Sequence, residues 1–250
     1  MHNFRVLTLN IHKGFSMGNR RFTLDGIRSK LRETQSNIVF LQEVVGEHER
    51  HQNKVPGWPE SNQFEFLADT VWSHYAYGKN AIYQHGHHGN AILSELPFTS
   101  STNIDVSRMR FSRRGILHGL LTNGIHLLCA HLGLFENERK LQISDLIQYI
   151  EEQIPANEPL ILAGDFNDWR KSGHRKLKSH CALEEAYEQL HQRLARTFPA
   201  FTPLLPMDRI YLRGFSVNTV EVMGNSGWRD LSDHCAVLAD IDLTTKSRID

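Results

Sequence analysis

Cysteine is scarce in this sequence. Only Cys129, Cys181 and Cys235 occur among its 250 residues, and no Cys-x-x-Cys pair is present. Three widely spaced thiols argue against a disulfide framework and favour reduced cysteines in a cytoplasm. Cys129 and Cys235 each lie in an apolar run, so we expect them to pack in the core rather than to bind a metal.

Long apolar runs are also missing. No stretch approaches the roughly 20 residues that span a bilayer. The chain starts directly in a strand-like run, MHNFRVLTLNI, without the basic segment and apolar stretch of a signal peptide. We therefore expect a cytoplasmic protein with no stable insertion into a membrane.

No excess of either charge is present, because 28 lysines and arginines balance 28 acidic residues. Binding to many phosphates takes a clustered basic surplus, so this balance argues against a polybasic nucleic-acid or membrane-surface protein. A local basic rim around a site stays compatible with it. The chain also shows no repeat, low-complexity tract or long linker, and we expect residues 1–250 to form one monomeric domain.

Short apolar runs predict several strands, and most are apolar at consecutive positions, as in strands covered on both faces. They are Val6–Leu9, Ile38–Leu41, Ala91–Leu93, Gly115–Leu121, Ile125–Ala130, Leu160–Ala163, Ile210–Leu212 and Ala236–Ile241. Helical spacing of apolar residues predicts helices over Thr23–Gln35, with Thr23 as N-cap, and Glu136–Gln153, and a shorter one over Asn62–Trp72. This mixture indicates an α/β fold of two packed sheets with helices outside.

Polar residues recur at the ends of these apolar runs. They are Asn10, Glu43, Asn90, His131, Asp165, Asn167, Asp208, Asp233 and His234. Most have an ordinary structural explanation when taken alone: Asn10 and Asn90 suit turns or loops, His131 suits a buried structural group, and Asp208 suits an ion pair with Arg209. For Glu43, an ion pair and a metal role are equally good explanations.

Two strings carry a stronger signal. In GDFN, Asp165 and Asn167 follow an apolar run two residues apart, so they point to the same side if the strand continues. In SDH, Asp233 and His234 form a carboxylate–imidazole pair before the last strand, although Ser232 also suits a helical N-terminus.

The combined set is rich in carboxylate and amide oxygens, which Mg²⁺ and Mn²⁺ prefer. A zinc hydrolase would need an HExxH helix or paired cysteines, and a serine hydrolase would need a GxSxG turn. No HExxH string and no paired cysteines occur. The string GFSMG at residues 14–18 matches the letters of GxSxG, but no predicted helix begins at its serine, as the nucleophile turn of a serine hydrolase requires.

Seven short motifs occur in a specific order: TLN, LQE, GNAILS, AHLGL, GDFN, DRIY and SDH. In that order they resemble the endonuclease/exonuclease/phosphatase superfamily, which has the DNase I fold, and in particular its short bacterial members. The resemblance spans nearly the whole chain, from Asn10 to His234. It implies a four-layer α/β/β/α sandwich of two packed mixed sheets, with the active site at one edge of both.

The resemblance also implies a site for Mg²⁺ or Mn²⁺. Glu43 would be the main metal ligand, with Asn10 beside it and Asp233 nearby. Asn90 and Arg114 would contact the substrate. A cation held in this way would neutralise a phosphoryl oxygen and the charge that builds on the leaving oxygen.

Five residues would carry the reaction if the resemblance holds. Asp165 would orient or deprotonate the attacking water, and Asn167 would hold that water or a phosphoryl oxygen. His234 would donate to the phosphoryl oxygens, with Asp208 as its hydrogen-bond partner. His131 would be the second histidine that faces the phosphate.

Basic residues cluster upstream of GILHGLL, at Arg108, Arg110, Arg113 and Arg114. Singly they suit a solvated loop, whereas together they would clamp a phosphate. Lys13 suits a phosphate neighbour or a solvent-exposed position equally well.

The string HGHH places His85, His87 and His88 in a glycine-flanked loop. We predict no metal site there, since no acidic partner is nearby in the sequence. The residues after GDFN are Asp168 and Trp169, where the family is variable. The chain lacks the tryptophan and cysteine that mark the inositol-polyphosphate 5-phosphatase branch, and His131 sets it apart from the abasic-site nucleases.

The function that these patterns favour is hydrolysis of a phosphodiester or phosphomonoester by in-line attack of an activated water. A DNA or RNA nuclease, a lipid phosphodiesterase and a small-molecule phosphatase all stay open as substrate classes. A binding module with a decayed site is less favoured, because Glu43, Asp165 and His234 are all present.

Overall fold

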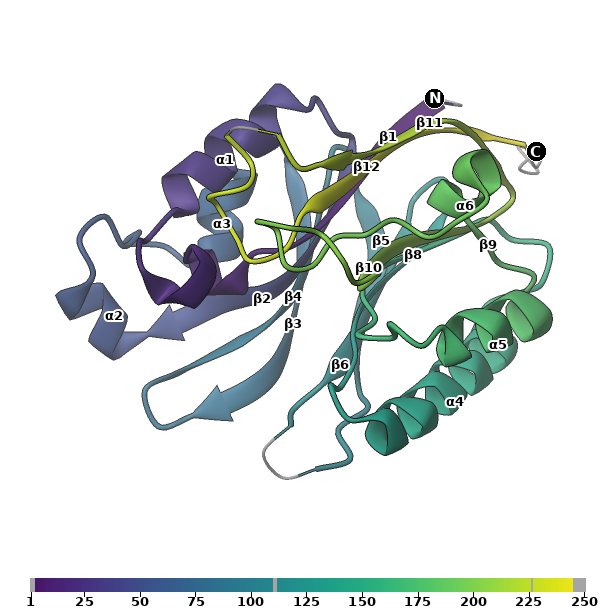
Figure 1. The fold of residues 1–250 in the computed structure, drawn as a ribbon, viewed down its shortest axis with the longest axis horizontal. Helices are drawn as coiled ribbons and strands as arrows, with labels where there is room; N and C mark the ends of the chain where they lie inside the picture. The colour runs from purple at the N-terminus through teal and green to yellow at the C-terminus, as the bar shows by residue number, and fades with distance from the viewer. Residues whose placement is uncertain (1–2, 110–111, 226, 245–250) are drawn as a thin grey trace.

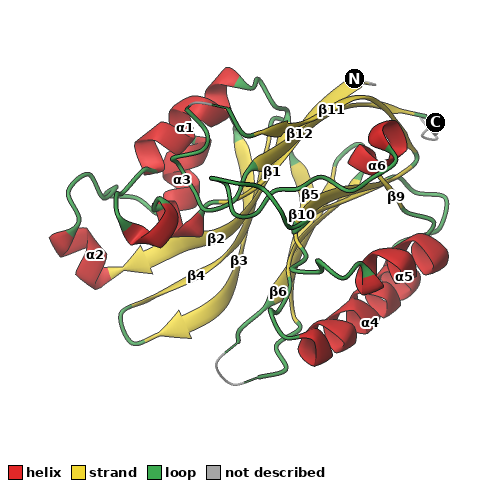
Figure 2. Cartoon of the chain, viewed as in Figure 1, coloured by secondary structure: helices red, strands yellow, loops and turns green. Residues whose placement is uncertain are grey.

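The computed structural model describes residues 3–109, 112–225 and 227–244, so Arg110 lies outside the described residues. Strands form the centre of the fold, with helices on its outer surfaces (Figure 2). The strands are β1 (Asn3–Asn10), β2 (Ile38–His48), β3 (His74–Tyr83), β4 (Gly86–Ser94), β5 (Phe98–Asp105), β6 (Gly115–Leu121), β7 (His126–His131), β8 (Leu160–Asp165), β9 (Glu184–Glu185), β10 (Asp208–Arg213), β11 (Phe215–Met223) and β12 (Ala236–Leu243). The helices are α1 (Leu24–Glu33), α2 (Glu49–Lys54), α3 (Gln63–Ala68), α4 (Glu136–Gln153), α5 (Ser172–Cys181) and α6 (Ala186–His191), with 3₁₀ turns η1 (His12–Gly14) and η2 (Met17–Asn19).

The strands form two mixed sheets of six strands each. The first sheet has the order β11-β12-β1-β2-β4-β3, and the second has the order β5-β6-β7-β8-β10-β9. Each has one parallel pair near its centre, β1 with β2 and β7 with β8, while the other pairs are antiparallel. Figure 1 shows the helices α1 and α3 outside the first sheet and α4 and α5 outside the second. The predicted four-layer α/β/β/α architecture is therefore confirmed.

The central core lies between the sheets. Phe4, Val6 and Phe40 from the first sheet join Cys129 and Ile161 from the second in one buried cluster. Strands covered on both faces must be apolar at consecutive positions, which explains runs such as Val39–Leu41. Cys129 and Cys235 are buried free thiols, as expected from their apolar surroundings.

Two further cores lie under the outer helices. In α1, Leu24, Ile27 and Leu31 are buried against the first sheet, which confirms the amphipathic pattern. Thr23 is the N-cap residue, but its hydroxyl donates to the backbone oxygens of Gly14 and Leu231 instead of accepting from the helix.

The helix α4 has the predicted bounds, Glu136–Gln153, and buries Leu146 and Ile150 against the second sheet. Leu141, which is also apolar, is exposed on the outer side of this helix.

The strand β2 continues through the residue at which the sequence predicted its end. It runs to His48, and its pairing with β4 is interrupted between Leu41 and Val44, so Glu43 lies at a bulge inside the strand. Glu43 has a φ of 58°, in the left-handed region that non-glycine residues seldom adopt. Asn167 shares this property with a φ of 50°. Such conformations persist only when the surrounding structure holds them, and they gather at functional sites.

Among the residues that the structure describes, no helix combines the length and the apolar character that crossing a membrane requires.

A buried carboxylate in the second sheet predicts a pH-dependent stability. Burial raises the pKa of Glu185 to about 7, and its Oε2 accepts from the backbone N–H of Glu188 at 2.7 Å. The folded state therefore binds more protons than the unfolded chain from about pH 4.5 to 7, and stability falls over that range as pH rises. At about 1.4 kcal/mol per pKa unit the loss reaches at most about 3.5 kcal/mol.

We expect Glu185→Gln to flatten this dependence, because an amide carries no proton to release. The measurement is the free energy of unfolding in urea from pH 4.5 to 8, with the exposed Glu60→Gln as the control that keeps the slope. An unchanged slope in Glu185→Gln would show that another group titrates.

Candidate active site

The two sheets bring their polar strand ends together at one shared edge. Asp165 ends β8, where it pairs in register with His131 at the end of β7 and with Asp208 at the start of β10. Asn10 ends β1 in the facing sheet and donates through Nδ2 to Oδ2 of Asp165 at 3.2 Å. His234 lies just before β12. Five strand ends from two sheets therefore meet at one point.

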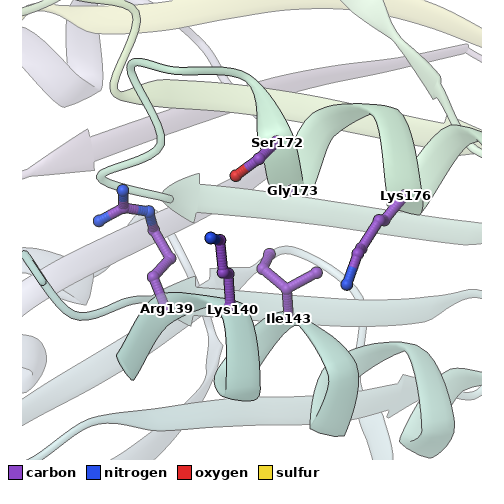
Figure 3. A pocket seen from close by; sticks show the side chains of 6 residues that line it. All are labelled: Arg139, Lys140, Ile143, Ser172, Gly173 and Lys176. Carbon is purple, nitrogen blue, oxygen red and sulfur yellow. The ribbon is translucent and has the colours of Figure 1, made fainter. Parts of the chain in front are cut away.

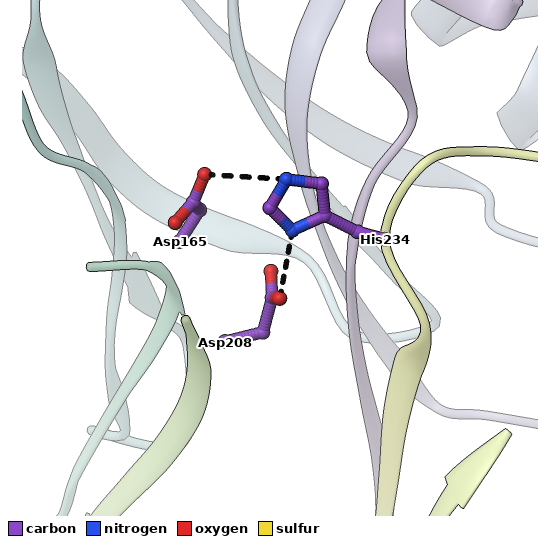
Figure 4. Close-up of side chains that lie close together, drawn as sticks. All are labelled: Asp165, Asp208 and His234. Carbon is purple, nitrogen blue, oxygen red and sulfur yellow. Dashed lines mark hydrogen bonds and ion pairs between the residues drawn. The ribbon is translucent and has the colours of Figure 1, made fainter. Parts of the chain in front are cut away.

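His234 lies between two buried carboxylates (Figure 4). Its Nδ1 is 2.8 Å from Oδ2 of Asp208, and its Nε2 is 3.9 Å from Oδ2 of Asp165. Burial opposes a charge on the ring, but Asp208 and Asp165 outweigh it and raise the pKa of His234 well above its usual value. The ring is thus a buried imidazolium, with Nε2 turned toward Asp165.

Asp165 is the most heavily hydrogen-bonded member of the group. Besides Asn10, it accepts the backbone N–H of Asn167 at 3.0 Å and the side-chain amide of Asn167 at 3.2 Å. His131 Nε2 lies 3.6 Å from its Oδ2. Burial raises the pKa of Asp165 above the ordinary carboxylate range, and His234 opposes that rise. A carboxylate whose pKa is moved toward neutrality suits general-base chemistry.

Glu43 approaches the same point from β2. Its Oε1 lies 4.0 Å from His131 Nε2, and its Oε2 lies 3.3 Å from Lys13 Nζ. Burial alone would raise the pKa of Glu43, but the facing His131 and Lys13 bring it to about 2. The carboxylate is therefore ionised, and its buried Oε2 accepts no hydrogen bond from any described residue.

This donor set fits a divalent cation. Ionised Glu43, whose Oε2 has an ion pair with Lys13 but no hydrogen bond among the described residues, is the kind of ligand that Mg²⁺ and Mn²⁺ prefer. Ligand atoms of Asp165, Asp208 and His234 also lie within 4.8 Å of one another. Since the Asp208–His234 hydrogen bond already engages two of those three side chains, the Glu43 side is the better place for a cation.

The other predicted metal and substrate residues border this centre. Oδ1 of Asp233 lies 3.7 Å from Nδ1 of His12, and the charge of Asp233 contributes to the raised pKa of His234. Arg114 faces the site. Burial is the larger cause of the low pKa of His131, and the charge of Arg114 lowers that pKa further. Their roles toward metal and substrate stay predictions.

Asn90 has a structural task in addition to any role toward substrate. It is fully buried, and its Nδ2 donates to the backbone oxygens of Gly115 and Cys129, at 2.9 and 3.1 Å. The side chain of Asn90 thus links β4 of the first sheet to β6 and β7 of the second. Its Oδ1 has no hydrogen-bond partner among the described residues.

One site residue was missed in the sequence. His88 lies opposite Val45 in the β2–β4 ladder, and its charge and that of Glu43 affect each other's pKa. Burial lowers the pKa of His88 to about 4, so the ring is neutral. The expectation that HGHH has no acidic partner was wrong for His88, because strand pairing brings in Glu43 from a distant segment.

The ion pair between Asp208 and Arg209 that the sequence left open does not form. Arg209 Nη1 instead lies 3.2 Å from Oδ2 of Asp168 and 3.0 Å from the hydroxyl of Tyr211. Asp168 also accepts the backbone N–H groups of Gly173 and His174 at the start of α5. Asp208 is therefore free to partner His234, while Arg209 and Asp168 fix the loop behind the site.

A small cavity of about 60 Å³ lies elsewhere, between α4 and α5 (Figure 3). Its lining consists of Arg139, Lys140, Ile143, Ser172, Gly173 and Lys176. None of the predicted site residues contributes to it.

The sequence profile of the Endonuclease/Exonuclease/phosphatase family matches residues 7–234. The chain belongs to this family. The matched segment begins in β1 and ends at His234, so it contains every strand end of the site. A relative in Escherichia coli strain K12, the uncharacterized protein YbhP, is 45% identical over 246 residues, which cover 96% of this chain and 97% of the relative.

Solved structures show how far the family fold extends. An endonuclease/exonuclease/phosphatase from Beutenbergia cavernae superimposes with a TM-score of 0.75 at 19% identity, covering 97% of this chain and 72% of that one. A humanized TDP2 from D. rerio gives 0.70 at 19% identity, covering 96% and 99%. A mannosyl-6-phosphatase from Bacteroides thetaiotaomicron gives 0.68 at 17% identity, covering 95% and 99%. At these identities the likeness establishes the family fold alone.

The His234–Asp208 contact yields a direct prediction. We expect Asp208→Asn to lower the pKa of His234, because an amide no longer favours the imidazolium. The measurement is the ¹⁵N chemical shift of the His234 ring against pH in metal-free protein. The exposed Asp230→Asn is the control and leaves the titration unchanged.

Loss of one partner of a buried charge pair also destabilises, by about 3–5 kcal/mol, so thermal melts accompany the titration. A His234 titration that is the same in Asp208→Asn and in the original chain would contradict the pairing.

Proposed function

We propose that this protein is a phosphoesterase that depends on Mg²⁺ or Mn²⁺ and hydrolyses a phosphodiester or phosphomonoester by in-line attack of water. The observation that carries the proposal is the position of His234 between Asp208 and Asp165, with His131 lying between Asp165 and Glu43. It combines a cationic donor, a candidate base and a candidate metal ligand at one edge.

Asp165 is the residue we assign to the attacking water. Its Oδ1 and Oδ2 are aimed by Asn10 and Asn167, so its direction is set before substrate arrives. Its raised pKa brings its affinity for a proton closer to that of water activated at neutral pH. The backbone N–H and the side-chain amide of Asn167 both donate to Asp165 and so orient it. Nδ2 of Asn167 also donates to the backbone oxygen of Leu132.

The histidines supply the donors to the phosphoryl oxygens. Asp208 fixes Nδ1 of His234, which leaves Nε2 as the donor toward the reacting group. His131 Nε2 lies between Asp165 and Glu43, and burial keeps the pKa of His131 well below its ordinary value. We therefore assign His131 as a neutral donor and His234 as the charged one.

Glu43 and Asn10 are the residues that would hold the cation, with Asp233 at its border. When bound, Mg²⁺ or Mn²⁺ would neutralise a phosphoryl oxygen and the charge on the leaving oxygen. Lys13, whose Nζ lies 3.3 Å from Oε2 of Glu43, would then border the cation.

The substrate we propose is a small or lipid-like phosphate ester rather than long duplex DNA. Related structures differ in what their names describe, from a TDP2 with a single-strand DNA product to a mannosyl-6-phosphatase. A dedicated duplex binder carries a clustered basic surplus, and this chain has none overall. We further propose that the protein acts as a monomer in the cytoplasm.

Metal dependence is the first test. We expect hydrolysis of a small phosphodiester to disappear in excess chelator and to return with Mg²⁺ or Mn²⁺. Glu43→Ala should raise the metal concentration needed for half-maximal rate, because it removes the ionised ligand. The matched control is Glu47→Ala, an exposed glutamate in the same strand. Full activity in excess chelator would refute the assignment.

Substrate class is the second test. A panel of plasmid DNA, RNA, phospholipids and small phosphate esters is assayed with Mg²⁺ and Mn²⁺ at low salt. We expect turnover of a small ester or phospholipid, reduced about 10²–10⁴-fold in Asp165→Ala, since general-base catalysis contributes on that order. Efficient nicking of DNA that depends on Asp165, with no turnover of the other substrates, would favour the nuclease alternative.

A further inference from the structure

Exposed apolar side chains gather on the loops around the active site. Most large apolar residues with high exposure leave the same edge of the two sheets as Asn10, His131, Asp165 and His234. We call the following set the site rim: Met17, Leu134, Phe135, Trp169, Phe201 and Leu204. Phe201 and Leu204 are 66% and 58% exposed, so more than half of each side chain faces water. Among the described residues, the site rim holds six of the eleven large apolar side chains with high exposure, and the other five lie on β3, α4 and α6. Scattered exposed residues need no explanation, but a group of six on the loops of one edge does.

One flank of the site rim borders His234. The loop that precedes β10 carries Phe201 and Leu204, and Phe198 of the same loop packs on the His234 ring at 4.9 Å between centroids. The backbone N–H of Ala200 donates to the backbone oxygen of Asp233 at 2.7 Å. Phe201 and Leu204 therefore belong to the loop that contacts His234 and the residue before it.

The opposite flank borders His131 and Asp165. Leu134 follows β7 three residues after His131, and Trp169 follows β8 four residues after Asp165. Arg139 joins the two loops: its Nη1 donates to the backbone oxygen of Leu134, and its guanidinium lies 5.0 Å from the Trp169 ring centroid. The exposed apolar residues thus lie on both sides of the reacting groups.

The charge beside the site rim is positive. A hollow of about 300 Å³ is lined by Met17 and Phe201 together with three arginines, Arg20, Arg21 and Arg229, and one acidic residue, Asp230. Arg229 lies 6.0 Å from the Phe201 ring centroid. Apolar tips next to arginines match a surface that is apolar inside and anionic outside, which is the profile of a bilayer with acidic headgroups.

From this arrangement we infer that the site rim docks on an anionic phospholipid surface, with Phe201 and Leu204 entering the headgroup layer and Arg20, Arg21 and Arg229 contacting acidic headgroups. The contact is peripheral and reversible, since it involves loop tips and no membrane-spanning element. Its consequence for substrate rests on the proposed function: a docked rim would present headgroup phosphates to His234 and Asp165.

The experiment is co-sedimentation of the full chain with vesicles of phosphatidylcholine, with and without phosphatidylglycerol. We expect binding to the anionic vesicles and little to the neutral ones. Arg20→Gln should weaken it about fivefold, the effect of one cation near an anionic surface. Phe201→Ser/Leu204→Ser should weaken it by a larger factor, even at low salt. The matched control is Leu190→Ser, which removes an exposed leucine on α6, away from the site rim.

Binding is measured without turnover and without metal, so its outcome is independent of whether the site hydrolyses anything. Circular dichroism confirms that each variant is folded. Three results would overturn the inference: no sedimentation with anionic vesicles, binding that survives Phe201→Ser/Leu204→Ser, or an equal loss in Leu190→Ser. Sedimentation equilibrium without vesicles checks for self-association; association that Phe201→Ser abolishes would show that the rim is a protein interface instead.

Discussion

The hydrogen bond from Asn10 to Asp165 joins the two sheets at the edge where the reacting groups lie. It spans 155 positions of sequence and exists only while the ends of β1 and β8 are level. The hydroxyl of Ser232 adds a third segment, because it donates to the backbone oxygen of Asn10 at 2.6 Å and so places Asp233 and His234. The distances between site residues therefore depend on how far apart the two sheets lie. The packing of the buried core between the sheets sets that separation.

Four carboxylates, Asp165, Asp208, Asp233 and Glu43, act on the buried groups of the site, against the three cations His234, Lys13 and Arg114. Asp165, Asp208 and Glu43 converge from both sheets, while His234 is the one buried imidazolium that faces them among the described residues, because His131 and His88 have lowered pKa values. Buried like charges cost free energy unless a partner offsets them. Lys13 partly offsets Glu43 from outside. A divalent cation beside Glu43 would neutralise the remaining negative charge. The charge distribution of the site therefore agrees with the proposed dependence on a metal.

The sequence predicted the central strands and the two long amphipathic helices because their patterns are dictated by burial. Gly115–Leu121 and Glu136–Gln153 were obtained with the observed bounds. Edge strands such as β5 were not predicted, because they are not buried on both faces. The strand β5, with the sequence FTSSTNID, is exposed along most of its length and contains no apolar run. The short, largely polar helix α5 was missed for a similar cause.

The site residues were accessible from sequence because strand ends in two sheets share one edge, so local strings such as GDFN already place their side chains. The sequence could not predict which side chain each site residue contacts in the folded protein. Arg209 follows Asp208 in the chain, yet it pairs with Asp168, because successive residues of a strand face opposite sides. Likewise His88 reaches Glu43 only through the register of β2 with β4. Partners separated by tens of residues depend on registers that no local pattern contains.

The reacting groups and the surface around them differ in how they are held. Asp165 and Asp208 belong to paired strands, whereas Phe201 and Leu204 belong to a loop that is free to differ in composition without disturbing the sheets. Yet that loop also contacts His234 through Phe198 and binds the backbone of Asp233 through Ala200. A ligand that displaces the tip of this loop would therefore act on the residues next to the His234 ring. In this fold the sheets fix the strand-end residues of the candidate site, and one loop connects those residues to the exposed surface around them.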